Sequence, residues 1–177
     1  SSYLKEAGME FLELVKKRYS VRAYKSIPVE DEKLQQVLEA ARLAPTGANR
    51  QSFQLIVVHT KGREAELRHI YDKDWFVQAP VIICACAMAV PGQPFREGGS
   101  SLNIGIVMDH LILAATSLGL GTCWIGAFNR DEAQRILGFP EEAKPVICAA
   151  LGYLDDSIQP RPKTRKPIGE LVRYEHW

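Results

Sequence analysis

The sequence lacks three common ligand-binding signatures: a C-x-x-C pair, a Gly-Lys-Ser/Thr loop, and a G-x-G-x-x-G segment between a strand and a helix. Their absence argues against a cysteine metal site, a nucleoside-triphosphate loop and a Rossmann dinucleotide site. An excess of one charge is lacking as well, because 22 lysines and arginines stand against 21 aspartates and glutamates. We therefore expect neither nucleic acid nor a membrane as a partner.

Cysteine is scarce, with four residues at positions 84, 86, 123 and 148. Cys84 and Cys86 alternate within a strand-like run, which places both on one face of a sheet. No further metal ligands lie near them in sequence, so we expect buried free thiols and no metal site. Free thiols fit a reducing cytoplasm, and no basic and apolar signal segment opens the chain. A cytoplasmic protein is therefore expected.

One uncharged run, from Leu111 to Phe128, has the length that spans a bilayer. Gly119, Gly121 and Gly126 interrupt this run, together with threonine and serine residues. We interpret it as a buried helix, a glycine turn and a buried strand rather than a membrane span.

Hydrophobic periodicity and turn residues predict the order of the elements. We expect helices over 9–18, 61–71, 102–118 and 130–137. A further helix is expected to begin with the acidic turn at 30–32 and to end before Pro45. Strands are expected over 53–59, 81–88 and 145–151, and a turn with a strand over 121–128. Loops are expected at 46–49 and, mobile, at 91–99, and a proline-rich basic tail begins at Gln159. The pattern predicts a single α+β domain over 1–177, with a sheet between two helical layers.

The first of three candidate clusters is Arg18-Tyr19-Ser20-Val21-Arg22, at the end of the first helix. Two guanidinium groups and a hydroxyl suit phosphate or carbonyl oxygens. The alternative is a solvated basic helix end, which the helix dipole also favours.

The second cluster, Ala44 to Gln51, contains the side-chain amides of Asn49 and Gln51 beside a glycine. Such amides can pair with the imide edge of a flavin or a pyrimidine, and the alternative is ordinary turn chemistry. The third cluster runs from Gly119 to Phe128, where Gly126 could let the backbone approach a flat ligand. Its alternative is a tight connection between a helix and a strand.

These clusters and a late Lys163-Thr164-Arg165 segment resemble the nitroreductase family in content and order. The shared patterns are Arg-x-Ser-x-Arg, Ala-Pro-Thr-Gly-x-Asn-x-Gln, Gly-Leu-Gly-Thr-Cys-Trp-Ile-Gly-Ala-Phe and Lys-x-Arg. The resemblance implies a three-layer α/β/α fold with a mostly antiparallel sheet and a C-terminal tail exchanged between subunits. Two departures are Ser52-Phe53, where many members have Pro-Trp, and Asn103, where an acidic residue is common.

The resemblance also implies FMN as the cofactor. A hydride would pass from NAD(P)H, or electrons from a ferredoxin-type donor, through FMN to a small organic acceptor such as a nitroaromatic or a quinone, with ping-pong kinetics. FMN rather than a catalytic side chain would carry the chemistry. The residues implied to bind FMN are Arg18, Tyr19, Ser20, Arg22, Asn49, Gln51, Trp124, Ile125, Gly126, Lys163 and Arg165. Reductive dehalogenation, flavin breakdown and a non-catalytic flavin-binding module stay open as alternatives.

A homodimer is expected on three grounds, one of which is the tail, because it ends in Tyr174 and Trp177 and these side chains need a surface to cover them. The resemblance implies that Asn49, with Gln51 near it, reaches a flavin held mainly by the other chain. In addition, the helix over 102–118 carries more apolar residues than one core-facing stripe needs. These residues are Ile104, Val107, Met108, Leu111, Ile112 and Leu118.

Overall fold

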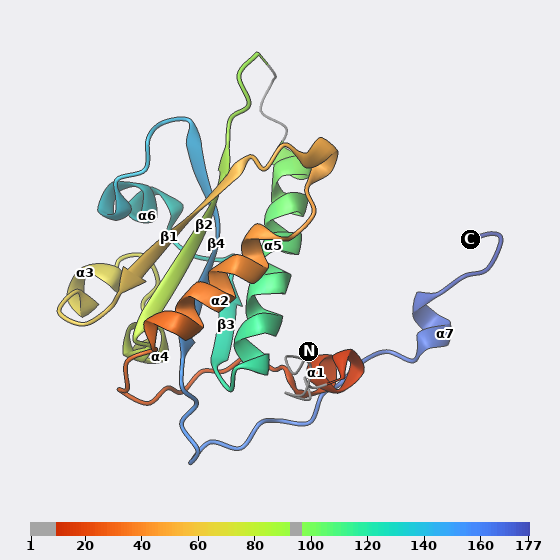
Figure 1. Ribbon diagram of the computed structural model, residues 1–177, viewed down its shortest axis with the longest axis horizontal. Coiled ribbons are helices and arrows are strands. Elements are labelled where there is room, and N and C mark those ends of the chain that lie inside the picture. The colour runs from red at the N-terminus through yellow and green to blue at the C-terminus, as the bar shows by residue number, and fades with distance from the viewer. Residues whose placement is uncertain (1–9, 93–96) are drawn as a thin grey trace, which may run out of the picture.

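A four-stranded sheet forms the centre of the computed structural model, which describes residues 10–92 and 97–177 (Figure 1). The strands are β1 (Phe53–His59), β2 (Val81–Met88), β3 (Gly121–Ile125) and β4 (Ala143–Gly152), in the order β1-β2-β4-β3. Each neighbouring pair is antiparallel, so the expected mostly antiparallel sheet is confirmed.

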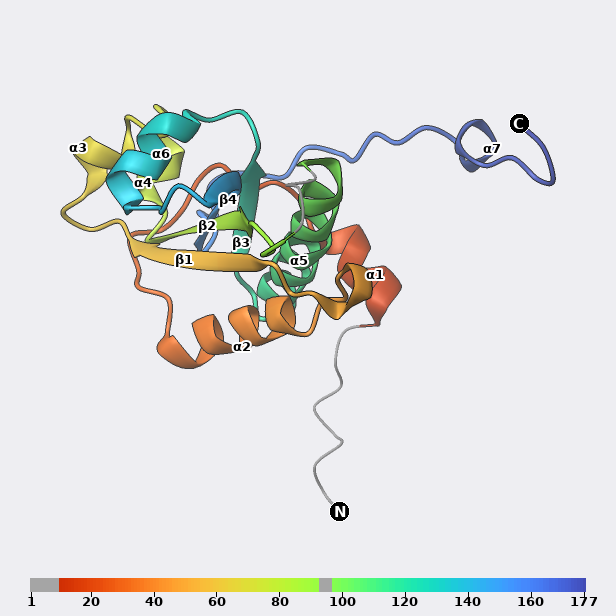
Figure 2. The same ribbon diagram turned by 90° about the horizontal axis from the view of Figure 1, so that it is seen from above.

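Helices cover both faces of the sheet, as Figure 2 shows. The helices α2 (Asp31–Arg42) and α5 (Glu97–Ser117) lie on one face, and α3 (Glu64–Leu67), α4 (Asp74–Gln78) and α6 (Arg130–Leu137) lie on the other. The α+β class and the three-layer α/β/α arrangement are therefore confirmed.

The inner strand β2 explains why two helical layers are needed. Val81, Ile83 and Ala85 pack into one core with α2 and α5, whereas Ile82 and Cys84 pack into the other core. Seven consecutive residues of β2 are buried, so neither face of the sheet at this strand is left in water.

Local sequence accounts for α2. Asp31 and Glu32 occupy its first turn, where the helix dipole favours negative charge. Leu34, Val37 and Ala41 recur at helical spacing and are buried. The helix ends at Arg42, before Pro45, as the sequence predicts.

The position of α5 corrects one expectation. Ile104, Val107, Met108, Leu111 and Ile112 are buried in the core of the same chain, and Leu118 packs against that core. The expectation that one chain leaves these residues uncovered is wrong, because α5 packs against both the sheet and α2. The apolar content of α5 therefore gives no argument for a partner subunit.

Three element boundaries are corrected as well. The helix expected over 61–71 is only the single turn α3. Ile70, whose apolar side chain suggests a longer helix, is buried but lies in the turn after α3. The short helix α4 follows this turn. The loop expected at 91–99 ends earlier, since α5 begins at Glu97, and residues 93–96 lie outside the described residues. The strand expected over 121–128 ends at Ile125. The strands over 53–59 and 81–88 and the helix over 130–137 are confirmed.

Two segments lie apart from the layers. Helix α1 (Phe11–Lys17) packs beside α5, at its lower end in Figure 1. The C-terminal tail leaves the body of the molecule, with every residue from Asp156 to Trp177 exposed and one short helix, α7 (Ile168–Leu171), within it (Figure 2).

Two sequence expectations concern the interior. All four cysteines are buried free thiols, as expected. Within residues 10–92 and 97–177, no helix combines the length and the apolar character that crossing a membrane requires.

Gly152, at the end of β4, offers a test of the packing. A Cβ at this position would lie 2.5 Å from Pro80 Cδ and 3.2 Å from Tyr24 Cδ1. Because both neighbours are rigid rings, Gly152→Ala should lower the free energy of unfolding by about 1–3 kcal/mol through overpacking. Urea unfolding measures this change. A Cβ at Gly169 would meet nothing within 4 Å, so Gly169→Ala should change the stability by less than about 0.5 kcal/mol. Equal losses in both variants would contradict the packing argument.

Candidate functional site

A basic cavity of about 700 Å³ lies between the segment after α1 and the first part of the tail. Its charged lining residues are all cations, namely Arg18, Arg22, Arg161, Lys163 and Arg165. Seven salt bridges occur in the described part of the chain, and none involves these five residues. Asp109 shares a neighbouring pocket with three of them without forming an ion pair. Cations that gather without carboxylate partners indicate an anion-binding site.

Lys163 fixes the tail against α1. Its ammonium group donates hydrogen bonds to the carbonyl oxygens of Val15, at 2.7 Å, and of Lys16. Burial lowers the pKa of Lys163, and the nearby guanidinium groups of Arg18 and Arg165 lower it further. Like charges are therefore held close together here, and a bound anion would relieve their repulsion.

The first motif runs alongside β3. The backbone N–H of Val21 donates to the carbonyl oxygen of Thr122 at 2.8 Å, and Ser20 bridges Thr122 in parallel. This pairing brings Ser20 next to Cys123. Burial raises the pKa of the Cys123 thiol, while Arg22, a hydrogen bond with Ser20, and Arg18 oppose that rise. Two motifs that are about a hundred residues apart in the sequence are thus neighbours.

Two side chains of the first motif also contact the layer formed by α3, α4 and α6. Tyr19 is half-buried against this core, and burial raises its pKa. The guanidinium carbon of Arg22 lies 5.8 Å from the ring centre of Trp75, which is within range of a cation–π contact. Trp75 in turn packs edge-on against Tyr71 and Phe76.

The third motif ends at an open position. Trp124 is 43% exposed, Ile125 is half-buried and Gly126 is exposed. A Cβ at Gly126 would meet nothing within 4 Å, and its φ lies outside the left-handed region. The packing of the chain itself therefore does not demand glycine here. The absence of a side chain leaves room for a neighbour that approaches the backbone closely.

The amide loop is a strained turn that contains the 3-10 helix η1 (Gly47–Asn49). Ala48, Asn49 and Gln51 each have a φ of 52°, which is uncommon outside glycine. The Gln51 amide donates to the backbone oxygen of Asn49 at 3.1 Å and to its Oδ1 at 3.2 Å. Asn103 Oδ1 accepts a hydrogen bond from the Gly47 N–H at 3.1 Å, so the residue that departs from the family pattern fastens this loop to α5.

Within one chain, the amide loop and the basic cavity border different parts of α5. The loop contacts Asn103 near the start of the helix. Arg18 shares one pocket with Asp109 and Leu113, in the middle of the helix, and another with Thr116 near its end. Asp109 lies six residues after Asn103 and Thr116 lies thirteen residues after it, which corresponds to about 9 Å and about 20 Å of helix. The structure thus unites Arg18, Ser20, Arg22, Lys163 and Arg165, but leaves Asn49 and Gln51 apart from them.

Sequence reasoning missed three side chains at or near this site. Arg161 lines the basic cavity, Trp75 lies against Arg22, and Arg130 contacts Gly126. None belongs to a motif. The density of basic residues in the tail was a signal for Arg161, and a cation at the start of a helix was a weak signal for Arg130.

The described residues contain a larger pocket, of about 830 Å³, between the start of α2 and the α3–α4 segment. Its charged lining residues have both signs, with Asp31 and Glu64 beside Lys61 and Arg68, and some of its polar groups are already engaged. The Thr60 hydroxyl donates to the Ala79 carbonyl oxygen, Glu64 accepts from the Gly62 N–H, and Arg68 pairs with two aspartates. The smaller basic cavity is therefore the better candidate for a charged cofactor. No cluster of three or more metal-ligating side chains occurs in the described ranges.

Comparison with known proteins identifies the family. The sequence model of the Nitroreductase family matches residues 15–73 and 62–153. The chain belongs to the nitroreductase family. A nitroreductase family protein of Clostridium difficile, known from a crystal structure, is 36% identical, with a TM-score of 0.82 over 96% of this chain and 100% of that chain. A second crystal structure, of a nitroreductase family protein from Clostridium novyi, is 28% identical with a TM-score of 0.74, over 84% and 87% of the two chains.

One relative has a name that states a reaction. The Bacillus subtilis protein FMN reductase (NAD(P)H) is 29% identical over 163 residues, which is 81% of this chain and 66% of that protein. Nitroreductases are oxidoreductases that use FMN, so the expected enzyme class and the expected cofactor are confirmed.

The lowered pKa of Lys163 predicts a pH dependence of anion binding in this nitroreductase. A bound anion favours the protonated ammonium, so the affinity should fall as the pH rises through the pKa of Lys163, which lies below the ordinary value of 10.5. Calorimetric titration of the apoprotein with sulfate, whose charge is constant in this range, measures the change. Lys163→Arg keeps its charge throughout and should show a flat profile. A fall of equal size in both proteins would assign the titration to another group.

Proposed function

We propose that this nitroreductase family member transfers a hydride from NAD(P)H, through FMN, to a small organic acceptor such as a nitroaromatic or a quinone, with ping-pong kinetics. The observation that carries the proposal is the cavity with five cations and no carboxylate in its lining. Such a lining suits the phosphate of FMN together with the negative charge of the reduced cofactor. The buried free thiols suit a reducing compartment, and we place the enzyme in the cytoplasm.

The proposed binding residues fall into four groups. Arg18, Ser20, Lys163 and Arg165 hold the phosphate and the ribityl chain, and Tyr19 shapes the wall beside them. Arg22 lies toward the pyrimidine edge, and Trp124, Ile125 and Gly126 lie against the flavin ring. Asn49 and Gln51 complete the site from the partner subunit. The open position at Gly126 supports this assignment, because a flat ring can approach the backbone there.

FMN, when bound, would supply the redox chemistry by carrying a hydride from the donor to the acceptor. The side chains of this chain contribute position and charge. Arg22 favours the reduced state by placing a cation beside the pyrimidine edge, and the Trp75 ring restrains the guanidinium. Lys163 keeps the tail on α1 and so closes the phosphate end of the cavity. No side chain is assigned as an acid or a base.

Anaerobic reduction of the purified holoenzyme tests this function. NADH or NADPH should bleach the yellow colour, and a quinone or nitroaromatic acceptor should restore it, with parallel double-reciprocal plots in steady state. Arg18→Ala should lose FMN and activity, whereas Arg173→Ala, a cation elsewhere in the tail, should keep both.

Other outcomes would replace the proposal. Bleaching by reduced ferredoxin alone would change the donor, and halide release from an aromatic halide would change the acceptor. Loss of the flavin in air, with fragments recovered, would indicate flavin breakdown. A bound flavin that no donor reduces would indicate a binding module.

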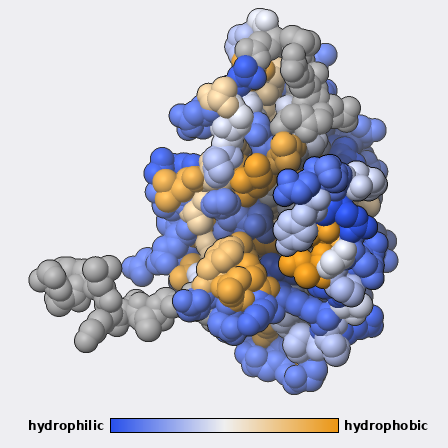
Figure 3. Space-filling model, turned by 90° about the vertical axis from the view of Figure 1, so that its right-hand side faces the viewer, coloured by the Kyte–Doolittle hydropathy of each residue, from blue (hydrophilic) through white to orange (hydrophobic). Residues whose placement is uncertain are grey.

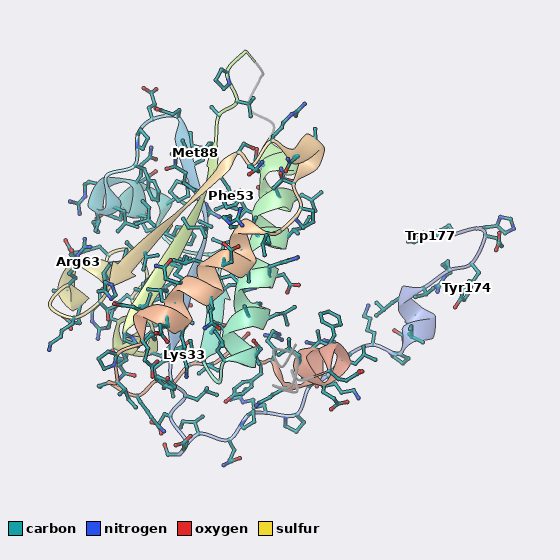
Figure 4. The ribbon with its side chains drawn as sticks, in the orientation of Figure 1. Lys33, Phe53, Arg63, Met88, Tyr174 and Trp177 are labelled. Carbon is teal, nitrogen blue, oxygen red and sulfur yellow. The ribbon has the colours of Figure 1, made fainter. Side chains whose placement is uncertain are left out.

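We propose further that the protein is a homodimer with exchanged tails and shared flavin sites. The tail ends in Tyr174 and Trp177, which are 84% and 107% exposed and lie far from the body of the molecule (Figure 4). On the side from which the tail projects, hydrophobic side chains gather at the surface (Figure 3). Exposed apolar residues in α1, α5 and α7 are Phe11, Leu12, Leu102, Ile168 and Leu171. A second copy would cover these residues.

Subunit mixing tests whether the sites are shared. Arg18→Ala and Asn49→Ala, each inactive alone, are denatured together and refolded. If each flavin takes Arg18 from one chain and Asn49 from the other, a mixed dimer has one intact site. Random pairing makes about half of the dimers mixed, so about a quarter of the wild-type activity should return. A wild-type sample treated in the same way controls for refolding. No return of activity would place each flavin within one chain.

A further inference from the structure

The turn after β3 is held by a guanidinium group. Arg130 Nη2 donates to the carbonyl oxygen of Gly126 at 2.8 Å, and Arg130 Cζ lies 5.0 Å from the centre of the Phe128 ring. One side chain thus contacts both ends of the turn, through a charge-assisted hydrogen bond and a cation–π contact.

The helix itself gives no reason for arginine at this position. Arg130 is the first residue of α6, and the dipole of a helix disfavours a cation at its N-terminus. Asp131 and Glu132, which follow, are the residue types that a first turn favours. Asn129 already caps the helix by accepting a hydrogen bond from the Glu132 N–H at 3.1 Å. The contacts with Gly126 and Phe128 account for Arg130, whereas the formation of α6 does not.

The turn has little support on the side of Gly126. Phe128 is buried in the core, and the Asn129 N–H donates to the Ile70 carbonyl oxygen at 2.9 Å, so the later end is anchored. Gly126 and Ala127 are exposed and follow the last residue of β3. The bond from Arg130 therefore restrains the end of the turn that packing leaves open.

We infer that Arg130 is a positioning residue, which fixes the turn from Gly126 to Phe128 so that the backbone of Gly126 meets the flavin ring. This inference rests on the proposed FMN site, because Arg130 acts on the cofactor only through Gly126. The charge of Arg130 also affects Cys148 in β4, beneath the turn. Cys84 and burial raise the pKa of the Cys148 thiol, and Arg130 acts against that rise.

Three variants separate positioning from general stability. Arg130→Met removes the charge and the donor but keeps a long side chain, and Arg130→Lys restores a charged donor. Arg135→Met is the matched control, because Arg135 lies in the same helix and pairs with Glu132 on the surface. Nitrogen-15 relaxation of the apoprotein gives order parameters for Gly126 and Ala127 without any cofactor, and fluorescence titration gives the FMN dissociation constant.

Arg130→Met should lower the order parameters of Gly126 and Ala127 from about 0.85 to below about 0.6. It should also weaken FMN binding about tenfold, the change that 1.4 kcal/mol produces. Arg130→Lys should recover most of both losses, and Arg135→Met should change neither. Unchanged order parameters in Arg130→Met would overturn the inference, as would the same losses in Arg135→Met. If the wild type binds no FMN, the proposed function fails, and the order parameters still decide whether Arg130 holds the turn.

Discussion

The burial of β2 on both faces is the constraint on which the rest of the structure depends. A strand with seven consecutive buried residues needs helices on each side. The layer of α2 and α5 meets this need on one face, and the layer of α3, α4 and α6 meets it on the other. The outer strand β3 then has one edge left, and the Ser20 segment pairs with it. The first motif reaches the glycine motif because the sheet ends there.

The positive charge at the site is a local excess that the near-neutral net charge of the whole chain does not reveal. Lysines and arginines exceed aspartates and glutamates by one, yet five cations line one cavity without a carboxylate among its lining residues. The repulsion among these cations affects Lys163, whose pKa is lowered by burial and by the charges of Arg18 and Arg165. Elsewhere on the described surface, cations such as Arg42 and Arg135 pair with glutamates one helical turn away. The cavity therefore gathers five cations at one place, where an anionic cofactor can neutralise them.

The sequence predicts those helices and strands whose hydrophobic pattern fits only one type of secondary structure. The apolar run of β2 between prolines and the capped, amphipathic α6 were predicted with their observed bounds. The α3–α4 segment was not, because Leu67 and Ile70 are both buried although only Leu67 is helical. Spacing alone cannot distinguish a buried turn from a buried helix.

The same limit applies to the site. Motifs predicted the residues that backbone pairing and the tail bring together, such as Ser20 beside Cys123 and Lys163 beside Arg18. Trp75, Arg130 and Arg161 have no motif, because each acts through a contact that only the folded chain creates. A cation at the start of a helix, as at position 130, is a weak signal of a functional contact. The helix dipole disfavours a cation there, so a contact elsewhere must account for it.

The position of α5 separates the two candidate parts of the site within one chain. Its buried apolar residues pack within the chain, so burial gives no reason for a second copy. The helix holds the amide loop near its start, whereas the residues of the basic cavity border its middle and its second half. A rigid helix inside a packed core keeps these two places apart. The proposed dimer, in which Asn49 serves a flavin held mainly by the other chain, agrees with this separation. The argument for a dimer therefore rests on the separation of functional groups and on an uncovered tail, and not on the apolar residues of α5.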